Sequence, residues 1–154
     1  MIVNIIGNID KPVTIIPMNK LKDKIVLVTG GSRGIGPVIA ESLSSQGACV
    51  ALSARSESGL HNVAERLSNT GSKVITVPAD LNIQSQREKL FETVMKEFGR
   101  IDILINNAGL ETEGAYSELS WASIQETVEV NLLAPMALTR LILPIMLKNN
   151  YGHI

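Results

Sequence analysis

The sequence of 154 residues predicts an α/β fold with a parallel sheet and helices on both faces. Two features carry this prediction. Short runs of apolar, often β-branched residues alternate with longer segments in which apolar residues recur at helical spacing. Strands buried on both faces and joined by amphipathic helices form right-handed βαβ units. The chain has the length of one domain and can bury a core.

The first half of the chain contains two such units. Ile25–Val28 is a short β-branched run, which predicts a strand. Apolar residues at helical spacing follow from residue 35 to 43, and Gly47 closes that helix. Ala48–Leu52 is a second apolar run, and the pattern at residues 60–67 predicts a second helix.

The second half repeats the alternation with a longer last helix. Val74–Val77 predicts a third strand, and residues 83–98 predict a third helix whose charged residues form a solvated face. Ile101–Ile105 predicts a fourth strand. Ser120 is a plausible N-cap for a fourth helix, whose apolar part continues over Leu132–Leu147.

The two ends differ from this pattern. Residues 1–20 are short apolar segments around two prolines, and we treat them as an N-terminal extension of a domain that spans residues 21–154. Gly152, His153 and Ile154 follow the last helix and indicate the opening of a further strand.

Composition excludes several classes of function. The net charge is −1 without a basic stripe, which argues against a nucleic-acid partner. No apolar run reaches eighteen residues, so we expect no membrane contact. Cys49 has no partner for a disulfide, which favours a reducing, cytoplasmic location. His61 and His153 are too isolated to predict a metal site.

The segment "TGGSRGIG", Thr29 to Gly36, connects the first strand to the first helix. A glycine-rich turn of this kind directs backbone N–H groups and the positive end of a helix at one point, which suits a diphosphate. Gly30 would make the tight turn, Gly34 would let the backbone approach the ligand, and Gly36 would allow close packing of helix on strand. The alternative is a glycine-rich turn that binds nothing.

A second motif, "NNAG", follows the fourth strand. Together with "KDKIVLVTGGSRGIG", "FGRIDILINNAG", "VNLLAP" and the final "GHI", it resembles the short-chain dehydrogenase/reductase family over residues 21–154. The resemblance implies an incomplete Rossmann-type, doubly wound parallel sheet in the order 3-2-1-4-5-6-7. It also implies a nicotinamide dinucleotide at the switch point between strands one and four.

The resemblance also implies a set of cofactor-binding residues. Asn106, Ala108 and Gly109 would line the adenosine-ribose side, and Asp80 would meet the adenine. The alternative for Asp80 is the N-cap of the third helix. The full predicted set is Gly30, Ser32, Arg33, Gly34, Ile35, Gly36, Arg55, Asp80, Leu81, Asn106, Ala108 and Gly109.

The end of the second strand, "LSAR", predicts the type of cofactor. A carboxylate there would bind the ribose hydroxyls of NAD(H), but Ala54 occupies the position. Arg55 and Arg33 carry guanidinium groups that suit the 2′-phosphate of NADP(H), which we expect to be preferred. NAD(H) is the alternative, with Glu57 on the ribose and Arg55 in solvent.

Asn131 matches, by resemblance, the asparagine of a catalytic Asn–Ser–Tyr–Lys set that holds a water in a proton relay. Pro135 has no N–H, so the carbonyl of Asn131 loses its usual helical donor and can bind that water. The alternative is a helix kinked at Pro135 without a catalytic role.

The remaining members of that set lie, in the family, beyond "GHI". Neither Tyr116 nor Tyr151 has a lysine four residues later. We therefore expect a truncated oxidoreductase portion that binds the dinucleotide without catalysing hydride transfer between it and a carbonyl or alcohol. The alternatives are a non-catalytic partner of full-length relatives and a product without function. A sheet edge and apolar helix residues left uncovered predict self-association.

Overall fold

The computed structural model describes residues 21–68 and 71–154. The predicted N-terminal extension, residues 1–20, lies outside the described residues. In chain order the elements are β1 (Ile25–Thr29), α1 (Ile35–Ser44), β2 (Cys49–Ala54), α2 (Glu57–Ser68), β3 (Val74–Pro78), α3 (Gln84–Phe98), β4 (Ile103–Ile105), η2 (Tyr116–Glu118), α4 (Trp121–Val128), η3 (Glu129–Leu133) and α5 (Ala134–Lys148).

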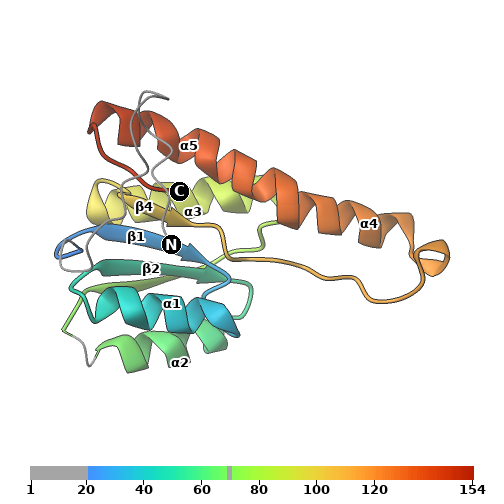
Figure 1. Ribbon diagram of the computed structural model, residues 1–154, viewed down its shortest axis with the longest axis horizontal. Coiled ribbons are helices and arrows are strands. Elements are labelled where there is room, and N and C mark those ends of the chain that lie inside the picture. Colours follow the sequence, from blue (N-terminus) through green and yellow to red (C-terminus); the bar gives the residue numbers. More distant parts are fainter. Residues whose placement is uncertain (1–20, 69–70) are drawn as a thin grey trace, which may run out of the picture.

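The four strands form one parallel sheet in the order β3-β2-β1-β4. Leu27 in the middle of β1 lies opposite Ala51 of β2 and Leu104 of β4. Helices α1 and α2 cover one face, and α3 and α5 cover the other (Figure 1). The α/β class and the predicted strand order 3-2-1-4 are confirmed.

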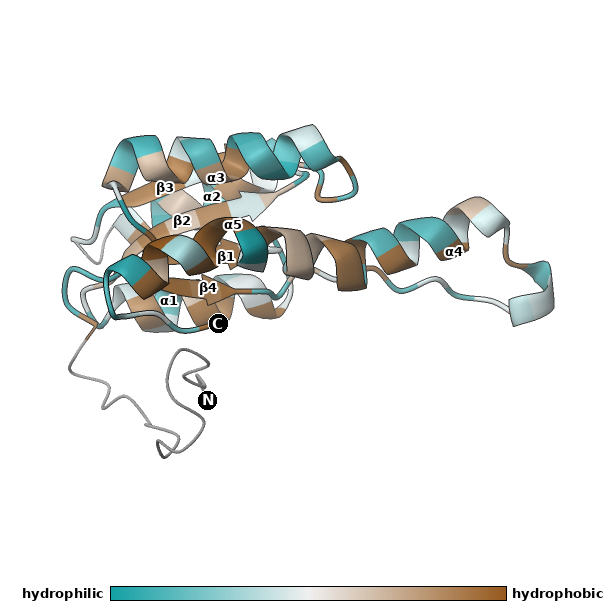
Figure 2. Cartoon of the chain, turned by 90° about the horizontal axis from the view of Figure 1, so that it is seen from above, coloured by the Kyte–Doolittle hydropathy of each residue, from teal (hydrophilic) through white to brown (hydrophobic). Residues whose placement is uncertain are grey.

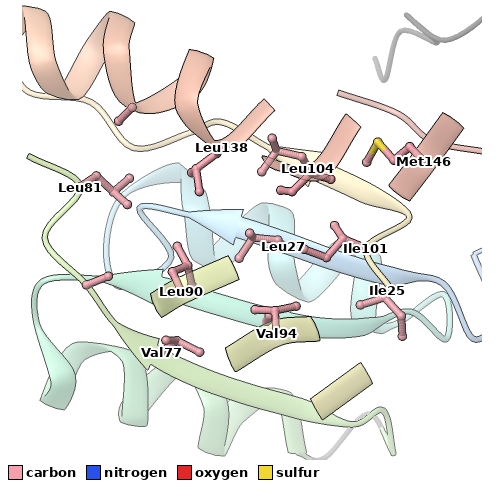
Figure 3. Packing of buried hydrophobic residues seen from close by; sticks show 14 residues of the cluster. Ile25, Leu27, Val77, Leu81, Leu90, Val94, Ile101, Leu104, Leu138 and Met146 are labelled. Carbon is pink, nitrogen blue, oxygen red and sulfur yellow. The ribbon is translucent and has the colours of Figure 1, made fainter. Parts of the chain in front are cut away.

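Alternating side chains of the strands build one core on each face of the sheet. Val26 and Val28 pack with residues of α1 and α2. Ile25 and Leu27 pack on the other face with residues of α3 and α5, among them Leu90 (Figure 3). The sheet is therefore buried on both faces, as the apolar strands predicted.

The segment after α5 begins to pair with the edge of the sheet. His153 forms a parallel bridge with Ile103. The N–H of Leu104 donates to the carbonyl of His153 at 2.9 Å, and the N–H of His153 donates to the carbonyl of Asp102 at 3.1 Å. The strand opening predicted at "GHI" is thus present beside β4.

Helices α4, η3 and α5 form one continuous run, Trp121–Lys148. In α5 every fourth residue is buried against the sheet: Ala134, Leu138, Ile142 and Met146. Helix α4 has no buried residue and extends beyond the sheet (Figures 1 and 2).

The run Trp121–Lys148, within the part of the chain that the structure describes, is long and apolar enough to cross a membrane. A core helix such as α5 meets the same criterion, and the absence of membrane contact stays a prediction.

The middle of this helix is wider than an α-helix. Segment η3 is a π-helix, and the N–H of Ala134 donates to the carbonyl of Glu129, five residues earlier. Pro135 follows directly, and its ring would collide with the carbonyl of residue 131 in a regular α-helix. A π-helical turn relieves that conflict, and the alternative of a kink at Pro135 stays a prediction.

Candidate functional site

A cavity of about 720 Å³ lies where the carboxyl ends of the strands meet. The loops after β1, β2, β3 and β4 all contribute to its wall, and α4 and η3 add Glu126 and Val130. Of the predicted set, the cavity is lined by Gly30, Ser32, Arg33, Gly34, Ile35, Arg55, Asp80, Leu81, Ala108 and Gly109.

The glycine loop has the geometry that the sequence predicted. Gly34 precedes α1 with φ of 64°, and a Cβ built on it would meet nothing within 4 Å. Gly36 lies behind the cavity wall, where a Cβ would stand 2.2 Å from the carbonyl oxygen of Gly30. The first position therefore leaves the helix N-terminus open to a ligand, and the second permits the contact between helix and turn.

Asn107, a residue outside the predicted set, holds the loop after β4 against β1. Its Nδ2 donates to the carbonyl oxygens of Thr29 at 2.9 Å and Gly30 at 3.3 Å. The Thr29 hydroxyl accepts from the N–H groups of Asn107 at 3.0 Å and Ala108 at 3.1 Å, and donates to the carbonyl of Ile105 at 3.1 Å.

Of the two adjacent asparagines, Asn107 lines the cavity, whereas Asn106 is exposed and is not part of its wall. The sequence alone does not distinguish them. The distinction depends on where β4 ends, which is Ile105. The role of Asn106 on the adenosine-ribose side stays a prediction, and Asn107 is the asparagine that lines the cavity.

Asp80 and Leu81 form the wall of the cavity after β3. The carboxylate of Asp80 accepts from the N–H of Asn82 at 3.0 Å, and Ile83 is the N-cap of α3. The alternative of Asp80 as the N-cap is therefore wrong. The Asp80 side chain instead stabilises the turn that presents Leu81 to the cavity.

Arg87 is a buried charge behind that wall, although the sequence analysis predicted a solvated charged face for its helix. Its Nη1 donates to the carbonyl of Leu81 at 2.5 Å and to Glu129 Oε1 at 2.6 Å. The side chains of Arg87 and Glu129 are 7% and 25% exposed. This ion pair joins the loop after β3 to the π-helical segment, and a single-sequence pattern does not reveal it because its partners lie 42 residues apart.

The two predicted arginines both line the cavity. Arg55 Nη1 lies 3.7 Å from Glu126 Oε1 of α4. Ala54 also lines the cavity, so no carboxylate occupies the end of β2. Glu57 begins α2, is exposed and does not belong to the cavity wall.

Asn131 lies beside a second, smaller cavity of about 480 Å³ and not in the wall of the first. Its Oδ1 accepts from the N–H of Leu110 at 2.8 Å, and its Nδ2 donates to the carbonyl of Leu110 at 2.7 Å. The side-chain amide thus holds the loop that follows "NNAG". Pro135 cannot donate to the backbone carbonyl of Asn131, so the predicted water-binding role would belong to that carbonyl.

The two tyrosines occupy opposite ends of the molecule. Tyr116 lines the second cavity near Asn131. Tyr151 lies near the start of β1, where Lys24 Nζ is 3.6 Å from its ring centroid. Burial, with a smaller contribution from the charge of Asp102, raises the pKa of Tyr151. Tyr151 is therefore remote from the cavity and cannot supply a proton there.

Comparisons with known proteins agree with this geometry. Residues 24–154 match the family model described as short chain dehydrogenase. The chain is 42% identical over 137 residues to a ketoacyl reductase, HetN, of Nostoc sp., covering 89% of this chain and 48% of that protein. It is 35% identical over 142 residues to dehydrogenase/reductase SDR family member 7 of Homo sapiens, covering 90% of this chain and 42% of that protein.

Solved structures give the same result. A metagenomic short-chain oxidoreductase in complex with NADP superposes with a TM-score of 0.82 at 34% identity, covering 86% of this chain and 60% of that one. L-Sorbose reductase from Gluconobacter frateurii, complexed with NADPH and L-sorbose, superposes with a TM-score of 0.79 at 33% identity, covering 82% and 48%. The chain spans about half the length of the curated relatives it matches.

Proposed function

Because the chain belongs to the short-chain dehydrogenase family, we propose that its large cavity binds NADP(H) through the adenosine diphosphate half. One observation carries this proposal. The open N-terminus of α1 and the two arginines share a cavity with the loop after β4, at the switch point between β1 and β4.

The residues present fit such a group. Backbone N–H groups of residues 32–36 at the start of α1 would bind the diphosphate, and Gly34 leaves the space for it. Asp80, Leu81 and Ala108 would surround the adenosine. Arg33 and Arg55 would bind a 2′-phosphate through charge-assisted hydrogen bonds. The dinucleotide itself supplies or accepts a hydride when bound.

For the whole oxidoreductase we propose hydride transfer between NADP(H) and a carbonyl or alcohol, in the cytoplasm. Within these 154 residues, the backbone carbonyl of Asn131 would hold a water, but it cannot serve as an acid. A positioned acid contributes about 10²–10⁴-fold in rate. We therefore propose that the 154 residues alone bind the dinucleotide without turnover.

Calorimetric titration of the purified chain with NADP and NAD tests the binding. NADP should bind more tightly, and Arg55→Asp should reverse the preference at a cost of roughly 1.5–3 kcal/mol in NADP binding. Ser58→Asp, an exposed change at the second residue of α2, adds the same kind of charge outside the cavity wall and is the control. Equal binding of NAD and NADP by the unmodified chain would contradict the preference.

Consumption of NADPH with a panel of ketones and aldehydes tests the absence of turnover. We expect no substrate-dependent rate. A rate that disappears on Tyr116→Phe would identify that tyrosine, at the second cavity, as a replacement acid and would contradict the proposal.

A second candidate function is association with full-length relatives or with a second copy. It is favoured by large apolar side chains that remain exposed on the last helix, namely Trp121, Val128, Leu132, Leu133, Met136 and Leu147. Sedimentation with and without a full-length relative tests it. A monomer that binds neither the relative nor a hydrophobic dye would contradict it.

A further inference from the structure

Glu126 is the one acidic residue of α4 and η3 that lies in the wall of the large cavity. Its carboxylate lies 3.7 Å from the guanidinium of Arg55, which extends from the end of β2 on the other side of the cavity. Both side chains remain partly exposed, at 57% for Arg55 and 38% for Glu126. Incoming ligand groups can therefore reach the space between them.

The helix that carries Glu126 is fixed where it crosses the cavity. Val130, one turn later, lines the same cavity. Glu129 is held by the buried guanidinium of Arg87, which also binds the carbonyl of Leu81 in the cavity wall. Glu126 thus sits one turn before residues that are anchored to the sheet domain.

The formal charges of the residues that line the cavity balance, with two positive and two negative side chains. Arg33 and Arg55 are positive, and Asp80 and Glu126 are negative. Asp80 already accepts the N–H of Asn82 in the turn after β3. Glu126 has Arg55 as its charged partner, and Arg55 is the residue proposed to bind the 2′-phosphate.

We propose that Glu126 sets the selectivity between NADP and NAD, because its carboxylate competes with the 2′-phosphate for the guanidinium of Arg55. The inference rests on the proposed dinucleotide binding. A 2′-phosphate placed on Arg55 would carry about −1.5 to −2 charges next to the carboxylate, as phosphomonoesters do near pH 7. NAD brings ribose hydroxyls instead, which avoid this repulsion and can donate to a carboxylate. Glu126 therefore weakens NADP binding and leaves NAD binding unaffected or slightly stronger.

Titration calorimetry with NADP and NAD on four variants tests the inference: Glu126→Gln, Arg55→Gln, the double variant, and Glu113→Gln. Glu113 is exposed, lies outside both cavities and controls for the change in net charge. Glu126→Gln should bind NADP about three- to tenfold more tightly at low salt and NAD no more tightly than the unmodified chain. Glu113→Gln should match the unmodified chain.

The double variant isolates the competition. In the Arg55→Gln background, Glu126→Gln should improve NADP binding by a smaller factor than in the unmodified background, because the competition for the guanidinium is gone and only the repulsion between carboxylate and phosphate remains. Weaker NADP binding by Glu126→Gln would show that the carboxylate positions Arg55, and an equal change for NAD and NADP would show that it acts on the shared part of the ligand. Either result overturns the inference while dinucleotide binding stands. Absence of binding by every variant and by the unmodified chain overturns the proposed function itself.

Discussion

The two halves of the last helix are attached to the molecule in different ways. The docked half, α5, buries an apolar residue on every turn against the sheet. The projecting half, α4 and η3 (Trp121–Leu133), buries none and contacts the rest of the chain largely through polar groups. Glu126 and Glu129 pair with Arg55 and Arg87, and the Asn131 side chain bonds the backbone of Leu110. Figure 2 shows the difference as an apolar band along α5 and a more mixed surface along α4.

This difference teaches which part of the helix can respond to a ligand. Apolar burial involves no charges that salt could screen, and it fixes α5 as part of the core. Ion pairs weaken with salt and change when a charged ligand enters, most of all where they are exposed. The projecting half forms part of the cavity wall, so the ion pairs that a charged ligand can change lie where the ligand would bind.

A matched pair of leucine substitutions should give the largest difference in stability between the two halves of the helix. Leu138 of α5 is 0% exposed and Leu132 of the projecting half is 55% exposed. Leu138→Ala should lower the free energy of unfolding by about 2–5 kcal/mol, because it leaves a cavity under the helix. Leu132→Ala should cost less than about 1 kcal/mol. Denaturant titration measures both, and equal losses would show that the projecting half is packed as tightly as α5.

A matched pair of glutamate substitutions sharpens the comparison within the projecting half. Glu129→Gln leaves the buried guanidinium of Arg87 without a counter-charge and should cost about 1–3 kcal/mol of unfolding free energy. Glu126→Gln removes an exposed partner at 3.7 Å and should cost less than about 1 kcal/mol. Thermal unfolding at two salt concentrations separates them. A loss for Glu126→Gln as large as that for Glu129→Gln would contradict the assignment of Arg87–Glu129 as the main anchor.

The smallest expected effect is a pH dependence of folding stability from His153, which follows the C-terminal end of α5. His153 is buried beside Tyr151, and burial, followed by the charge of Lys24, lowers its pKa. The unfolded chain, with a histidine pKa of about 6.5, then binds the proton more readily than the folded chain. The contribution of His153 to stability should be present above about pH 6.5 and decrease as the pH falls below it.

Denaturant midpoints between pH 8 and pH 5 for the unmodified chain and His153→Gln test this expectation. Tyr151, whose ring contacts the imidazole, and Lys24 are the same in both proteins. The unmodified chain should lose more stability than the variant. Parallel pH profiles would mean that His153 accepts a proton in the folded state without cost.

The sequence patterns predicted the features that depend on residues close together in the chain. The strands, the glycine loop and the N-cap at Ser120, whose hydroxyl accepts from the N–H of Ser123 at 3.1 Å, are features of local spacing. Ion pairs such as Arg87–Glu129 depend on how distant elements dock, and the sequence marks neither partner as special. The choice between Asn106 and Asn107 depends on a strand end, and boundaries follow tertiary pairing more than local preference.

The π-helical segment contains one residue more than the α-helical turn it replaces. Each residue advances an α-helix by about 100° around its axis. Deleting one residue between Glu129 and Leu133 would remove this surplus, with α5 still fixed by its buried residues. The projecting half would then rotate by roughly that angle. Glu126 and Val130 would turn away from the cavity, and one wall of the binding site would be lost without any change in its own residues. The phase of the helix, set at Pro135, is thus as much a part of the site as the side chains that line it.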